Sequence, residues 1–402
     1  MGRQRGTTRR RLNPRLPAPA DALLAAAAVV VLLAWPYIQL GGALPIGAWH
    51  ADAPLADLLA LAFFPLAALT LWRGPLPPGT VGYAVMLGAG VAGAMATTDS
   101  GAGLHELVRK PLFSGLIYGI GLAAFVARTA HLALVRRTML AAVAVCASIS
   151  LTTSVGRIVA GDALWFHAIE GLTNNHKTLA VALAPALPLL WGWPAPRGEA
   201  RWQRGVVALA GIALAASLSR TAWIGAVLAA TYFIFVGGRP LAARRGLVPI
   251  LLVLGLWAAT YLPLHLPYRS ITQIDALRSR RSIDLRSWGL FVAHPLVGAS
   301  PGASVRTVVP TFPHYRVNGV DAHGVVQKVG AEYGLIGLCG YGAFVLVLGR
   351  RVRARHRDGN GRWPAFVALH SNLLLSTEAF SQTHWVVLGV VLGLTAREEG
   401  QA

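Results

Sequence analysis

Apolar residues in this chain gather into long runs, separated by short segments rich in arginine, glycine and proline. Uncharged runs of this length predict membrane-crossing helices, because a bilayer core of about 30 Å needs about 20 apolar residues. Several runs are near ~17 residues, the short end of that range. We count twelve runs, at 22–40, 55–72, 80–96, 112–127, 138–155, 178–193, 205–218, 221–236, 247–264, 333–349, 363–377 and 384–396. The pattern predicts an all-α polytopic membrane protein of about twelve transmembrane helices.

The composition agrees with a membrane protein. Hydrophobic residues make up 55% of the chain and charged residues only 13%, whereas a soluble domain carries about 25% charged residues. This argues against a soluble enzyme, a disordered protein and a coiled coil. The two cysteines, Cys146 and Cys339, fall inside apolar runs and form neither a disulfide framework nor a metal motif. We therefore expect the whole chain, 1–402, to form a single integral membrane domain.

The net charge of +20 comes from arginines placed between the apolar runs, which favours a membrane topology over nucleic-acid binding. With the basic N-terminal segment 1–21 in the cytoplasm, 23 of the 36 basic residues lie in cytoplasmic segments. Five lie in short outside loops and eight in one long outside loop, 265–332. Cytoplasmic loops carry an excess of Lys and Arg, so we predict that both termini are cytoplasmic and that 265–332 lies on the outer side of the membrane.

The long loop is unusually basic for an outside segment, with eight basic residues against four acidic ones. Apolar residues from Ile271 to Phe291 recur at broadly helical spacing and are interleaved with Arg278, Arg280, Arg281 and Arg286. One interpretation is a helix in the membrane interface, with its arginines toward lipid headgroups. The other is a basic ceiling over a membrane cavity that binds a phosphorylated lipid. Both remain open.

Several single residues are candidates for chemistry. Arg220 lies between two apolar runs, where a charge is costly and marks either a functional group or a side chain that reaches the outer surface. His323 precedes the tenth run and His176 opens the sixth on the same side, although a lone histidine is more often structural. The candidate substrate-binding residues are Arg220, Arg286, Arg316, Lys328, His176 and Glu332.

Sequence patterns for metal and nucleotide chemistry are missing. No Asp-x-Asp or Asp-x-Glu pair, which could hold a divalent cation, occurs in the chain. Neither a phosphate-binding P-loop nor a His-Glu-x-x-His helix is present. We expect chemistry on the outer face that uses no metal and no other cofactor.

Four landmarks, in this order, resemble the O-antigen ligase family, which includes O-antigen polymerases and O-linked protein oligosaccharyltransferases. They cover about 217–394, and one departure is Gly324, where the family usually has Asn or Ser after the key histidine. The landmarks are Ser219-Arg220 with Trp223, then Arg286 with Trp288 and His294-Pro295-Leu296-Val297-Gly298, then Ala322-His323 with Glu332-Tyr333-Gly334-Leu335-Ile336-Gly337, and last His370-Ser371 with the apolar tail to Leu394.

The resemblance implies a metal-independent, inverting glycosyl transfer at the periplasmic face of the bacterial inner membrane. The donor would be a glycan on undecaprenyl diphosphate, and the acceptor of a ligase would be a sugar hydroxyl of lipid A–core. Arg220 and Arg286 would clamp the diphosphate. His323 would accept or orient the acceptor's proton, and Glu332 could orient His323. Both substrates would enter from the surrounding membrane lipids, and nucleic acid is not an expected partner.

Three other interpretations remain. A polymerase of the same family would use another lipid-linked repeat as acceptor, and a protein oligosaccharyltransferase would use Ser or Thr. Members of that last group often carry a sizeable soluble C-terminal domain, whereas only six residues follow the twelfth run here, which favours a ligase. In another class, a transporter or flippase of an anionic lipid or solute would place basic residues along a path that reaches both faces.

Overall fold

The structure is a computed structural model of the full chain. It describes residues 18–34, 44–46, 49–51, 79–98, 100–159, 176–217, 219–235, 283–306, 324–355, 360–375 and 382–401. These residues are helical apart from turns and one short antiparallel hairpin, in which strands β1 and β2 pair Leu44 with Ala51 and Ile46 with Trp49.

The helices follow the apolar runs of the sequence. Ten of the twelve expected runs coincide with helices, and the other two, 55–72 and 247–264, lie outside the described residues. A further helix covers 283–293, here called the 283–293 helix. The elements are α1 (Ala18–Ala34), β1 (Leu44–Ile46), β2 (Trp49–Ala51), α3 (Thr80–Met95), α4 (Ser100–Leu107), η1 (Val108–Gly121), α5 (Leu122–Arg128), α6 (Leu132–Val159), α7 (His176–Gly192), α8 (Ala200–Ala216), α9 (Arg220–Phe235), α11 (Ala303–Arg306), α12 (Val325–Ala354), α13 (Arg362–Leu375) and α14 (Gln382–Gln401).

Within the described ranges, three helical segments are long and apolar enough to cross a membrane: Ser100–Arg128, Leu132–Thr152 and Val325–Ala354. The first is continuous through α4, η1 and α5, and its middle part is a wide π-helix with Pro111 inside. Four shorter apolar helices accompany them, within α1, α3, α7 and α9. Helices of this length and composition indicate a membrane-associated protein.

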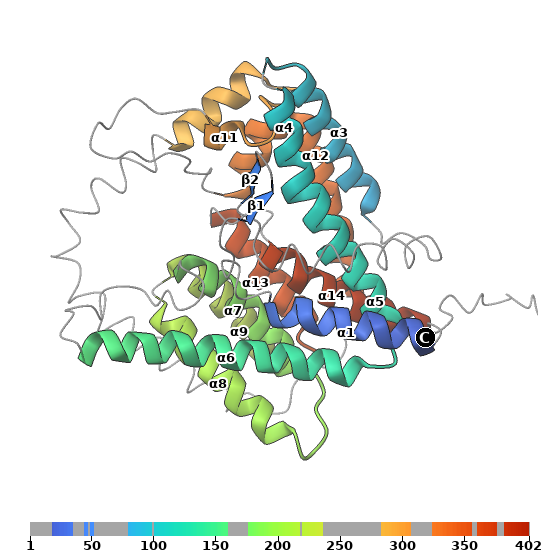
Figure 1. Ribbon diagram of the computed structural model, residues 1–402, viewed down its shortest axis with the longest axis vertical. Helices are drawn as coiled ribbons and strands as arrows, with labels where there is room; N and C mark the ends of the chain where they lie inside the picture. The colour runs from blue at the N-terminus through green and yellow to red at the C-terminus, as the bar shows by residue number, and fades with distance from the viewer. Residues whose placement is uncertain are drawn as a thin grey trace, which may run out of the picture.

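Two groups of helices run in different directions. In the upper half of the view, α3 packs along α12 beside the α4–η1–α5 helix (Figure 1). In the lower half, α1 and α6 lie side by side and run across the view (Figure 1). The α3–α12 contact is close because two glycines face each other: a Cβ on Gly82 would come within 2.6 Å of the Gly340 oxygen, and the converse distance is also 2.6 Å. Small residues allow such close approach of membrane helices.

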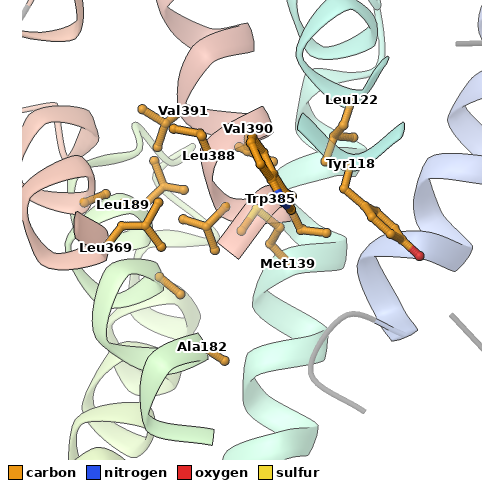
Figure 2. Packing of buried hydrophobic residues seen from close by; sticks show 14 of the residues in the cluster. Tyr118, Leu122, Met139, Ala182, Leu189, Leu369, Trp385, Leu388, Val390 and Val391 are labelled. Atoms are coloured by element: carbon orange, nitrogen blue, oxygen red, sulfur yellow. The ribbon is translucent and has the colours of Figure 1, made fainter. Parts of the chain in front are cut away.

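The buried core lies between α14 and the helices around it. Trp385 of α14 is 2% exposed and lies between Tyr118 and Leu122 on one side and Leu189 and Leu369 on the other (Figure 2). The core therefore joins η1 and α5 to α7 and α13 through α14, which packs against all four.

A cluster of ion pairs holds the turn between α7 and α8. Glu199 accepts hydrogen bonds from Arg136 and Arg137 of α6. Gln203 donates to the carbonyl of Trp193 (2.8 Å). Arg136 is only 2% exposed, so its charge is neutralised here by a carboxylate, as buried charges generally require.

Candidate functional site

Helix α12 is interrupted at Gly334, whose φ of 65° and ψ of −163° are not helical. The expected tenth run begins at 333, next to this break. The segment 294–302 fills the break by hydrogen bonding. The amides of Leu335 and Ile336 donate to the carbonyls of Pro295 (2.8 Å) and Leu296 (3.1 Å), and the Ala299 amide donates to the Ala331 carbonyl (2.8 Å). These bonds replace those that the helix loses at the break, because a buried backbone group without a partner is costly.

Two glycines make this crossing possible. A Cβ on Gly298 would lie 2.3 Å from the Glu332 carbonyl carbon, and a Cβ on Gly334 would lie 2.4 Å from the Leu296 carbonyl carbon. Both glycines also have positive φ, 78° and 65°, which side chains rarely tolerate. Two of the expected landmarks, Pro295–Gly298 and Glu332–Gly334, are therefore one structural unit.

The first turns of α12 carry a buried charged pair. Lys328 Nζ lies 3.5 Å from Glu332 Oε1, and these residues are 2% and 1% exposed. The hydroxyl of Ser304, in α11, donates a hydrogen bond to the same carboxylate oxygen. Lys328 and Glu332 were both expected to bind substrate. In the structure their charges face each other, and together with Ser304 they connect α11 to α12.

The 283–293 helix packs on the same part of α12, because a Cβ on Gly330 would lie 3.5 Å from a ring carbon of Phe291. Arg286 belongs to this helix, and its Nε and Nη2 atoms are buried without a hydrogen-bond partner among the described residues. Asp284 does not partner it: its buried Oδ1 has no hydrogen bond either. Burial lowers the pKa of Arg286, but a guanidinium starts so high that it stays charged.

For Arg220 and His176 the structure gives the position of the backbone only. They are the first residues of α9 and α7, and both helices pack against α13. A Cβ on Gly225 of α9 would lie 3.1 Å from the Asn372 amide oxygen, so the start of α9 lies beside the last turn of α13. Arg316 and His323 are outside the described residues.

Gly324, which follows His323 in the sequence, is described, and it also lies beside the end of α13. Gly324 has φ of 109°, and a Cβ on it would lie 2.5 Å from the carbonyl oxygen of Leu374. The residue that precedes α12 therefore touches the end of α13, which also lies next to the start of α9. The start of α9 and the residue before α12 therefore both lie beside the last turn of α13.

Two polar residues here were missed by sequence reasoning. Ser304 follows the Pro-Leu landmark without any pattern that would predict its contact with Glu332. Asn372 is fully buried, and both polar atoms of its amide lack a hydrogen-bond partner among the described residues. The available signal was the polar stretch His370-Ser371-Asn372 inside an apolar run.

Among the described residues, no three His, Cys, Asp or Glu side chains come together as a metal site would require. Neither a protein-family model nor a curated protein sequence matches the chain. The likeness of its landmarks to the O-antigen ligase family therefore stays a resemblance.

Proposed function

We propose that this protein is a polytopic inner-membrane glycosyltransferase of the O-antigen ligase type. It transfers a glycan from undecaprenyl diphosphate to a sugar hydroxyl of lipid A–core, at the periplasmic face and without a metal ion. The proposal includes twelve membrane spans, cytoplasmic termini and a periplasmic loop over 265–332. The three membrane-length helices and the distribution of arginines between the apolar runs support that topology.

The observation that carries the proposal is that two nitrogen atoms of the Arg286 guanidinium, Nε and Nη2, are buried and have no hydrogen-bond partner among the described residues. Buried donor atoms without a hydrogen-bond partner are rare in proteins. The buried N–H groups of Arg286 have no acceptor among the described residues, so they are available to a ligand anion. A guanidinium binds phosphate with forked, charge-assisted hydrogen bonds. A lipid-linked diphosphate is an anion that a membrane enzyme would meet at this position.

In the proposed reaction, the acceptor oxygen forms a bond to the anomeric carbon of the donor glycan. The bond from that carbon to the diphosphate oxygen breaks, and its electron pair leaves with undecaprenyl diphosphate. Arg286 and Arg220 stabilise the negative charge that grows on the leaving group. The acceptor's proton goes to a ring nitrogen of His323, which acts as the general base.

The test is transfer by purified protein with undecaprenyl-diphosphate glycan, lipid A–core and EDTA, and no nucleotide. We expect a glycosylated lipid A–core from the wild type. His323→Ala should lower the rate by about 10²–10⁴-fold, the usual contribution of a general base. Product would be followed by gel mobility and mass spectrometry, and Arg204→Ala, on an exposed face of α8, is the matched control.

Each other outcome selects a different interpretation. Longer lipid-linked glycan without lipid A–core product would identify a polymerase, and transfer to Ser or Thr of an added protein would identify a protein oligosaccharyltransferase. Strong inhibition by EDTA that a divalent cation reverses would contradict the metal-free step. Movement of glycan across reconstituted vesicles, driven by ATP or a proton gradient and without transfer, would indicate a transporter.

A further inference from the structure

The 283–293 helix has an apolar face that no described part of the protein covers. Leu285, Trp288 and Val292 are 60%, 63% and 60% exposed, and their spacing of three and four residues places them on one side of the helix. Leu296, in the turn that follows, is 63% exposed. The opposite side contains Ser287, which is 3% exposed. The helix therefore turns its apolar side outward, which is unusual for a water-exposed segment.

This apolar stripe, Leu285–Trp288–Val292–Leu296, continues onto a helix that is long enough to cross a membrane. Leu335 and Ile336 of α12 are 51% and 42% exposed. Their amides donate to Pro295 and Leu296, so their exposed side chains lie next to the end of the stripe. The stripe and the outer side of α12 form one apolar surface, whose natural cover beside a membrane helix is lipid.

The break in α12 also indicates how deep the 283–293 helix lies in the membrane. From Leu335 to Arg350, where the basic cluster begins, the helix has 16 residues, or about 24 Å at 1.5 Å each. Arginine side chains extend further to reach headgroups, so this length fits a hydrocarbon core of about 30 Å. The break, and with it the 283–293 helix, then lies at the edge of the hydrocarbon.

We infer that the 283–293 helix is a membrane-interface helix, whose apolar stripe is immersed in the bilayer lipid. Tryptophan favours the interface because its ring is apolar and its N–H is polar, and amphipathic helices bind there through their apolar face. Arg286 follows Leu285 directly and lies between the exposed and buried sides, at the level of lipid phosphates. This inference stands whether or not the protein transfers glycans.

The test measures the depth of a fluorescent label in nanodiscs. A single cysteine replaces Val292 in a Cys146→Ala/Cys339→Ala background and carries a bimane label. Lipids with a nitroxide near the headgroup, lipids with a nitroxide near the chain end, and aqueous iodide serve as quenchers. Two matched positions calibrate the scale: Leu346→Cys, on the exposed side of α12, and Gly198→Cys, in the exposed turn before α8. Leu285→Cys, on the same stripe, replaces Val292→Cys if that variant does not fold.

We expect the label at 292 to be quenched severalfold more by the shallow nitroxide than by the deep one, the reverse of the label at 346. Iodide should quench it severalfold less than the label at 198. Iodide quenching equal to that at 198 would overturn the inference by placing the stripe in water. Preferential quenching by the deep nitroxide would overturn it as well. Protection from all three quenchers would show that another protein surface, such as a second copy of the chain, covers the stripe.

Discussion

Arg286 combines two properties that are seldom found together, a permanent positive charge and buried donor atoms with no acceptor among the described residues. Removing donors from water costs free energy unless new hydrogen bonds replace the lost ones. Keeping this arrangement is therefore reasonable only if a ligand completes it. A planar fork of N–H groups also selects the ligand, because it matches two oxygens of a phosphate better than a single ammonium does.

Arg286→Lys is therefore expected to lower the transfer rate by about 10²–10³-fold, the range for losing one preorganised donor to a developing oxyanion. The positive charge is kept, so only the fork is lost. The rate of transfer is measured at saturating donor, with Arg204→Lys as a surface control of the same chemistry. A wild-type rate in Arg286→Lys would show that the fork is not used.

At the scale of single residues, the sequence analysis singled out Lys328 and Glu332 but did not predict that they pair with each other. Lys328 and Glu332 were expected to face a substrate, because they were assigned to a loop that ended at 332. The helix begins at Val325 instead, and four residues along a helix bring two side chains to the same face. Ser304 completes the pair from a segment 28 residues away along the sequence, a separation that no local pattern predicts.

At the scale of elements, the contact of the 294–302 segment with the break in α12 joins two parts of the chain that lie 36 residues apart, counted from Gly298 to Gly334. Sequence analysis identified both as landmarks of a resemblance. It could not predict their contact, because the contact is made by backbone atoms, which are the same in every residue. The requirement for glycine is the one trace of this contact that the sequence retains.

Gly298→Ala or Gly334→Ala is expected to destabilise the protein strongly. Positive φ alone costs about 1–2 kcal/mol with a side chain, and the added carbon would also overlap backbone atoms at 2.3–2.4 Å. The midpoint of thermal unfolding in detergent, followed by tryptophan fluorescence, is the measurement. Gly88→Ala, within α3, meets nothing within 4 Å and should unfold at or above the wild-type temperature. Equal midpoints for all three variants would contradict the crossing.

The buried pair at the start of α12 allows a double-mutant cycle. Lys328→Met leaves the Glu332 carboxylate buried without its cation, and loss of one partner from a buried pair costs about 3–5 kcal/mol. Lys328→Met/Glu332→Leu removes both charges and should be more stable than Lys328→Met alone. Free energies of unfolding in denaturant would be compared for the two singles, the double and the wild type. Additive effects of the two single substitutions would mean that the residues do not interact.

For the whole molecule, the regular alternation of apolar runs and basic segments was the most informative pattern, because helix length in a membrane is fixed by the bilayer. Ten of the runs coincide with helices. The directions of the helices were not predictable, because hydropathy reports how deep a residue lies and not which neighbour it packs against. One direction that hydropathy does not predict is that of α1 and α6, which run across the direction of α3 and α12 (Figure 1).

The cluster at the α7–α8 turn makes stability depend on pH. The hydrogen bond donated by Arg137, helped by the charge of Arg136, holds the pKa of Glu199 below its usual value. A carboxyl with a lowered pKa stabilises the fold above its unfolded pKa of about 4.3, and this contribution is lost as the pH falls through the folded value. Glu199→Gln should therefore unfold at a lower temperature than the wild type near pH 7. The difference between the two midpoints should shrink as the pH falls below about 4 and disappear below the folded pKa of Glu199; a constant difference would contradict the role of this ionisation.

The three hydrogen bonds that tie the 294–302 segment to α12 have a consequence for hydrogen exchange. The amides of Leu335, Ile336 and Ala299 are donors on opposite sides of one contact, so none can meet solvent unless the contact opens. Their exchange rates should report a single cooperative opening, rather than the fraying of a helix end beside an independent loop. Any displacement of the 294–302 segment in a working cycle must then shift the first turns of α12 as well.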